Sequence, residues 1–113
     1  MFFKRKTCAI PQRWISSVKE KLKRGSGSEI EWTREAFERW HIYGTRCEAY
    51  DAMRKALVPG VIGKYVKMPI DEGETYSFLF IAKNEQMYGK ICLTYDGRLL
   101  IIYSAHKSER EEL

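Results

Sequence analysis

The chain has few cysteines and histidines. Its 113 residues include three cysteines that stand far apart, Cys8, Cys47 and Cys92, and two histidines, His41 and His106. An odd number of cysteines without close pairs does not form a disulfide framework, and no C-x-x-C or histidine spacing typical of zinc is present. We therefore expect free thiols, a reducing cytoplasmic environment and no metal site.

Long apolar runs and familiar catalytic motifs are also missing. No segment approaches the roughly 20 consecutive apolar residues of a membrane helix. Residues 1–6 lack the apolar core of a signal peptide. The chain contains no P-loop, dinucleotide-binding, zinc-protease or serine-hydrolase motif. The sequence thus predicts a cytoplasmic protein with no membrane association and no bound cofactor.

Acidic residues are scarce in the first 24 positions. This segment carries eight Lys or Arg residues against one acid, Glu20, whereas the rest of the chain has twelve basic and fourteen acidic residues. Much of the positive charge falls on one predicted helix, at Lys19, Lys21, Lys23 and Arg24. Such a field suits nucleic acid or an acidic protein, so these four residues are predicted RNA contacts. A solvated helix face explains the same charges equally well.

The first helix is predicted over residues 11–24. Pro11 suits the first helical position, where a missing N–H costs nothing. An apolar stripe at helical spacing is expected to face the core: Trp14, Ile15, Val18 and Leu22. A flexible Gly/Ser joint is predicted at residues 25–28.

Two further helices are predicted within residues 33–57. Thr33 can cap a helix that extends through Trp40. Thr45 and Glu48 have the spacing of a capping box, in which the Thr hydroxyl and the Glu carboxylate each accept from the other's backbone N–H. This box predicts a third helix that extends to about Leu57.

The second half of the chain has the pattern of a β-sheet, which is expected within residues 61–104. Strands are predicted near residues 61–68, 75–82, 87–95 and 98–104, with turns at 71–74 and 83–86. Helices followed by strands are typical of the α+β class. We predict one domain over residues 1–113, with the N-terminal helices packed on one face of a four-stranded antiparallel β-meander and the other face partly open.

Asp96 and Gly97 lie between two apolar runs and predict the register of the last hairpin. If both take φ > 0 as a two-residue loop, Leu93 pairs with Leu100 and Lys90 pairs with Tyr103. Side chains alternate across a sheet, so one face would carry Ile91, Leu93, Leu100 and Ile102. The other face would carry Tyr88, Lys90, Cys92, Ile101, Tyr103 and Lys107.

The predicted open face joins tyrosines to lysines. Tyrosine can stack on a base or move a proton, and lysine can neutralise phosphate charge in a transition state. Those roles suffice to cleave RNA through its own 2′-hydroxyl without a metal. The candidate catalytic residues are Tyr88 and His106 for proton transfer, Lys67, Lys90 and Lys107 for phosphate charge, and Tyr103 beside them. Tyrosine and lysine also occur on exposed strands that bind nothing.

The order of these elements resembles the RelE-type ribonuclease toxins of the barnase–colicin–RelE group, with the motility quorum-sensing regulator toxins as the nearest pattern. The resemblance covers roughly residues 14–107. It depends on a short helix with a Val-Lys centre and a Gly exit, a Thr-capped helix, a Tyr/Lys strand, a Tyr-x-Lys strand and an apolar strand closed by a lysine. Here these are Val18-Lys19 to Gly25, Thr33, Lys64-Tyr65-Val66-Lys67, Tyr88-Gly89-Lys90, and Leu100 to Lys107.

The resemblance implies a metal-independent endoribonuclease toxin that acts on mRNA and is neutralised by a small acidic antitoxin. In that family, lysines, a Gln and a Tyr on the open sheet face perform the cleavage. By position, the resemblance assigns these roles to Lys67 or Lys64, to Tyr88 and to Lys107. If Lys67 is the catalytic lysine, Lys64 is expected to contact RNA. The Gln has no counterpart, since Gln86 falls in a predicted turn.

Two other functions fit the same residues. One is a non-catalytic nucleic-acid or ribosome-binding module that uses the basic helix and the Tyr/Lys face. The other is a phage or mobile-element protein that inhibits a host protein, for which a large exposed apolar patch would be the sign.

Overall fold

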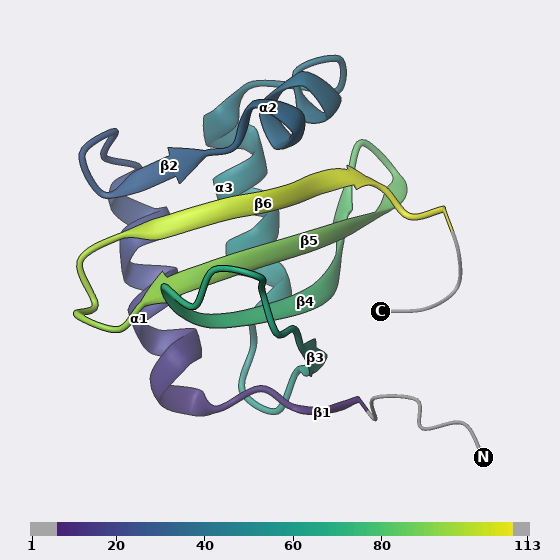
Figure 1. Cartoon of the computed structure of the whole chain (residues 1–113). Helices are drawn as coiled ribbons and strands as arrows, with labels where there is room; N and C mark the ends of the chain where they lie inside the picture. The colour runs from purple at the N-terminus through teal and green to yellow at the C-terminus, as the bar shows by residue number, and fades with distance from the viewer. Residues whose placement is uncertain (1–6, 110–113) are drawn as a thin grey trace.

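A computed structural model describes residues 7–109, which form three helices and six strands (Figure 1). In chain order these are β1 (Cys8–Ala9), α1 (Gln12–Arg24), β2 (Ile30–Trp32), α2 (Arg34–Trp40), α3 (Arg46–Ala56), β3 (Ile62–Tyr65), β4 (Gly73–Ala82), β5 (Glu85–Thr94) and β6 (Leu100–Lys107). The strands form one sheet in the order β1-β3-β4-β5-β6-β2. The fold is therefore α+β, as predicted.

The sheet differs from the prediction in extent and in direction. The predicted antiparallel meander forms its middle, from β3 to β6. Two short strands that the sequence pattern did not reveal flank this meander. β1 pairs antiparallel with β3, and β2 pairs parallel with β6, so the six-stranded sheet is mixed. Strands of two and three residues are too short to show an alternating pattern.

α1 packs its apolar stripe into the core, as predicted. Trp14, Ile15 and Val18 are fully buried, and the Trp14 indole donates a 3.0 Å hydrogen bond to the carbonyl oxygen of Glu74 on β4. Pro11 is the N-cap residue, with extended backbone (φ −56°, ψ 133°), and the helix begins one residue later than predicted. Gly25 ends it in the left-handed conformation.

The predicted caps of the next two helices are present. The Thr33 hydroxyl accepts from the Ala36 N–H at 3.2 Å, and α2 extends through Trp40. Thr45 and Glu48 form the reciprocal capping box, with bonds of 3.1 and 2.9 Å. α3 ends at Ala56, one residue short of the predicted end.

The three helices cover one face of the sheet, and Figure 1 shows α1 and α3 behind β4, β5 and β6. Alternate strand residues fill the space between the layers and are buried, among them Phe78, Phe80, Met87, Ile91, Leu100 and Ile102. We call the opposite side the outer face of the sheet. The side chains of the outer face do not pack against the helices, so they are available for a binding or catalytic site.

The two long hairpins have turns that differ from the predicted ones. Lys83 and Asn84 form the two-residue turn between β4 and β5, with φ values of 55° and 61°. These left-handed values are those of a type I′ turn. In the last hairpin Gly97 has φ 73°, whereas Asp96 has no positive φ. The Asp96 carboxylate accepts from the Arg98 N–H and the Thr94 hydroxyl, which stabilises a longer loop.

Candidate functional site

The pairing of β5 with β6 matches the predicted register up to Ile102 and then shifts. Leu93 pairs with Leu100 and Ile91 with Ile102, as predicted. Lys90, however, pairs with Ser104 and not with Tyr103. Tyr103 is an extra residue on β6, so this point is a β-bulge. The prediction was wrong here because a regular ladder was assumed.

The bulge decides which of two neighbouring residues lies beside Tyr88. His106 pairs with Tyr88, and Lys107 pairs with Met87. Because Met87 is fully buried in the core, Lys107 lies on the helix side of the sheet. There its ammonium is 3.0 Å from a Glu85 carboxylate oxygen, which raises the pKa of Lys107. The expectation that Lys107 shares the face of Tyr88 is therefore wrong.

Tyr88 and His106 form the centre of the candidate site. Their ring centroids are 5.4 Å apart, and the ring planes are tilted by 30°. His106 Nδ1 lies 2.8 Å from the carbonyl oxygen of Lys107, so Nδ1 carries the proton that donates to it. The other ring nitrogen, Nε2, is then an acceptor in the neutral imidazole. A phenol and a proton acceptor thus lie side by side on the outer face.

Two lysines lie near this pair on the same face. The register across the sheet runs from Lys64 on β3 to Ser77 on β4, to Lys90 on β5 and to Ser104 on β6. Residues that pair directly across strands point to the same side. Since adjacent strands are about 4.8 Å apart, the backbones of Lys64 and Lys90 are separated by roughly 10 Å. That spacing allows both ammonium groups to reach one phosphate.

Gln86 is a candidate site residue that was not predicted from the sequence. The predicted turn at 83–86 is shorter, and β5 begins at Glu85. Gln86 pairs with Ile81 and is exposed, two residues before Tyr88 and therefore on the same face. A two-residue type I′ turn at Lys83 and Asn84 would have indicated that β5 starts at Glu85 and includes Gln86. We define the Tyr–His face as Lys64, Gln86, Tyr88, Lys90, Ser104 and His106.

The other half of the outer face is closed by residues 66–72, which we call the strap (Figure 1). Beneath it Thr75, Cys92 and Ile101 form one row across the sheet and are buried. The Glu72 carbonyl oxygen accepts from the Tyr95 N–H at 3.2 Å, which ties the strap to the last hairpin. The open part of the outer face is therefore the half around Tyr88 and His106.

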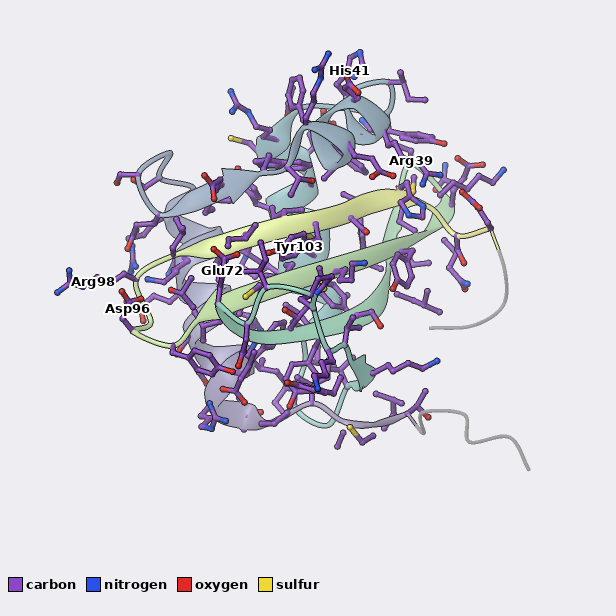
Figure 2. All side chains as sticks on the ribbon, viewed as in Figure 1. Arg39, His41, Glu72, Asp96, Arg98 and Tyr103 are labelled. Carbon is purple, nitrogen blue, oxygen red and sulfur yellow. The ribbon has the colours of Figure 1, made fainter. Side chains whose placement is uncertain are left out.

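Tyr103 lies at the border between the strap and the open half. Its hydroxyl donates to a Glu72 carboxylate oxygen at 3.0 Å, and the two side chains meet in front of the sheet in Figure 2. Burial and this carboxylate raise the pKa of Tyr103 to about 12. Tyr103 thus lies on the predicted face, but its hydroxyl is hydrogen-bonded to Glu72 of the strap. With this raised pKa, Tyr103 is protonated at neutral pH.

Lys67 lies in the strap and not in a strand, because β3 ends at Tyr65. The predicted strand over 61–68 was too long at both ends. Lys67 is exposed, and in the described part of the chain no hydrogen bond or ion pair ties it to the Tyr–His face. It is therefore omitted from the Tyr–His face.

The basic helix, α1, lies in the helix layer behind the sheet (Figure 1), whereas Tyr88 is on the outer face by the strand register. Lys21 is buried, 3.3 Å from a Glu29 carboxylate oxygen, and Arg24 pairs with both Glu20 and Glu29. The structure does not favour the predicted RNA contact of Lys21, because its ammonium is buried and paired with Glu29. Lys23 is exposed and Lys19 is half-buried, so these two remain candidates.

The candidate site is made of strand side chains alone. Within residues 7–109, no cluster of three or more His, Cys, Asp or Glu side chains is placed to hold a metal ion. None of the described helices is both long enough and apolar enough to cross a membrane. His41 is the C-cap residue of α2, labelled at the top of Figure 2, and its Nδ1 is 2.9 Å from the Glu38 carbonyl oxygen.

Comparison of the chain with known proteins found no matching family, no similar curated protein and no similar solved structure. The resemblance to RelE-type toxins therefore stays a prediction.

Proposed function

We propose that this protein is a metal-independent endoribonuclease that cleaves RNA on the Tyr–His face. The observation that carries the proposal is the contact between Tyr88 and His106, whose rings are 5.4 Å apart on the open half of the outer face. One residue can take a proton and the other can give one, which is the minimum that cleavage by the 2′-hydroxyl requires.

The proposed reaction begins at His106. Its Nε2 accepts the proton of the ribose 2′-hydroxyl, because Nδ1 already donates to the Lys107 carbonyl. The 2′-oxygen attacks the adjacent phosphorus, and the bond from phosphorus to the 5′-oxygen breaks. The Tyr88 hydroxyl donates its proton to that 5′-oxygen as it leaves. The products are a 2′,3′-cyclic phosphate and a 5′-hydroxyl end, and the proton on His106 returns to the Tyr88 phenolate through water.

Lys64 and Lys90 supply charge in this scheme. A pentavalent phosphorane carries more negative charge on its non-bridging oxygens than the ground state does, so fixed cations stabilise the transition state. The two lysines flank Ser77 on either side, and Lys90 is paired with Ser104. Gln86 adds an amide donor beside Tyr88.

The proposed partners are RNA, with mRNA on the ribosome as one form of substrate, and a small acidic antitoxin protein. The net charge of +5 suits both. A non-catalytic RNA-binding module is the second candidate, favoured by one observation: the exposed charge of Lys23 is on the opposite layer from Tyr88. Inhibition of a host protein is the third candidate, for which exposed apolar side chains such as Ile42, Ile70 and Ile81 would be the contacts.

The nature of the cleaved ends tests the proposal. Purified protein is incubated with a single-stranded RNA in EDTA, with and without ribosomes, beside the same strand carrying one 2′-deoxy position at a mapped cleavage site. We expect cleavage in EDTA, 2′,3′-cyclic phosphate ends and protection at the 2′-deoxy position. Binding without cleavage of any RNA would support the binding module instead. Cleavage that persists at the 2′-deoxy position would contradict the proposed chemistry.

A further inference from the structure

A hollow lies away from the Tyr–His face, where the end of β2 meets the starts of α2 and α3 and the C-terminal end of α1. Its volume is about 600 Å³. Three aromatic rings line it, Trp32, Phe37 and Tyr50, together with the arginines Arg34 and Arg46. We call it the aromatic hollow.

The aromatic rings are held in fixed positions. The Trp32 indole N–H donates a 2.7 Å hydrogen bond to the Tyr50 hydroxyl, and the two ring centroids are 6.1 Å apart. Phe37 meets Trp32 edge to face, at 6.4 Å and 88°. Tyr50 is buried below, Trp32 is half-buried and Phe37 is 41% exposed. Trp32 is therefore a rigid ring that stays open to a ligand.

The charge of the hollow is positive. The Arg46 guanidinium carbon is 5.6 Å from the Phe37 ring centroid, so the ring positions this cation. Arg34, on the first turn of α2, has a highly exposed side chain that pairs with Glu38 at 3.2 Å. No Asp or Glu is among the residues that line the hollow within the described chain. The walls therefore favour an anion and disfavour a cationic ligand.

We propose that the aromatic hollow binds one nucleotide of a single-stranded nucleic acid, with its base on Trp32 and its phosphate on Arg46. A planar apolar ring beside a fixed guanidinium matches the two halves of a nucleotide, and base stacking on an aromatic side chain tolerates any base. Gly27 leaves the rim open, since a Cβ at this position would have no atom within 4 Å. The inference concerns binding alone and does not depend on RNA cleavage.

Tryptophan fluorescence reports on this binding directly. Trp14 and Trp40 are fully buried and Trp32 is half-buried, so a ligand that stacks on Trp32 changes the emission of the one tryptophan it can reach. The probes are adenosine 5′-monophosphate, adenosine, inorganic phosphate and a 2′-deoxy oligonucleotide that the proposed ribonuclease does not cleave. We expect saturable quenching by the monophosphate and the oligonucleotide, weaker quenching by adenosine, and none by phosphate. Trp32→Phe should remove the signal.

Charge variants separate a built site from general attraction. Arg46→Gln should weaken binding of the monophosphate roughly 10- to 100-fold, because it removes a charge-assisted hydrogen bond. It should also lower the salt slope for the oligonucleotide by about 0.7. Arg98→Gln is the matched control, since it removes the same charge at an exposed residue of the last hairpin loop, labelled at the left of Figure 2, that does not line the hollow. We expect it to leave binding of the monophosphate unchanged.

Three results would overturn the inference. They are no quenching by any nucleotide, equal weakening by Arg46→Gln and Arg98→Gln, or saturable quenching by an acidic peptide that nucleotides do not compete with. Tyr88→Phe should bind the monophosphate like the wild type, so a failure of the proposed cleavage site would leave this result intact. Unfolding temperatures of all variants exclude loss of folding as the cause.

Discussion

At the residue scale, two tyrosines on the outer side of the sheet have different surroundings. Tyr88 lies against a histidine on the open half of the face. Tyr103 lies against the strap, where burial and the Glu72 carboxylate raise its pKa to about 12. A phenol with such a pKa stays protonated at neutral pH, so Tyr103 is a poor base. We assign it a structural role, in which it anchors the strap to the bulge.

Replacing Tyr103 by Phe tests this division of roles. We expect Tyr103→Phe to keep RNA cleavage within about twofold and to lower the free energy of unfolding by about 1 kcal/mol, through loss of one hydrogen bond. Because the folded pKa is above the unfolded one, the wild type should lose stability as the pH rises from about 10 to 12. The variant should lose less. Chemical denaturation at several pH values measures both, and a large loss of cleavage in a folded variant would contradict the assignment.

At the element scale, Glu29 ties the end of α1 to the start of β2. Its carboxylate accepts from Arg24 and from Lys21, and these contacts lower its pKa to about 2. Part of the positive charge that the sequence predicts to bind RNA is therefore neutralised by ion pairs within the protein. Two of the four predicted contacts on this helix, Lys21 and Arg24, pair with Glu29, which follows in the chain.

The role of Glu29 predicts a loss of stability in acid. Its folded pKa lies below the usual 4.5, so its contribution is present above about pH 4.5 and is lost as the pH falls toward 2. Glu29→Gln should therefore be less stable than the wild type at neutral pH and should show a smaller fall over this range. Glu20→Gln is the control, because Glu20 is more exposed and pairs with Arg24 alone. Equal acid profiles for Glu29→Gln and the wild type would show that the ion pairs contribute nothing.

The bulge at Tyr103 is the second feature at this scale, and crosslinking tests it without any activity. Directly paired residues have Cα atoms about 5.5 Å apart or less, within the range of a disulfide. In a background with Cys8→Ser and Cys47→Ser, the pair Tyr88→Cys and His106→Cys should form a disulfide on mild oxidation. The matched pair Tyr88→Cys and Ala105→Cys should not, because Ala105 is buried and pairs with Gly89 on the helix side of the sheet. A regular ladder would instead pair Tyr88 with Ala105, so the reverse result would show that β6 continues without a bulge.

At the scale of the whole molecule, the sequence predicted the layers better than the site. Caps and apolar spacing are local signals, so the three helices and the meander could be predicted. The residues beside Tyr88 depend on two features without such a signal. A single extra residue in β6 exchanges His106 for Lys107, and a tight turn at Lys83 and Asn84 brings Gln86 into β5. The strap is a tertiary contact that no periodicity reveals.

In the proposed mechanism, RNA is cleaved on the Tyr–His face by His106 and not by its neighbour Lys107. The most direct test compares His106→Ala with Lys107→Ala in RNA cleavage in EDTA, with unfolding temperatures to show that both are folded. Loss of a general base costs about 10²- to 10⁴-fold, so we predict that His106→Ala loses this much activity and Lys107→Ala stays within a few-fold of the wild type. Full activity in folded His106→Ala, or its loss in Lys107→Ala alone, would contradict the account.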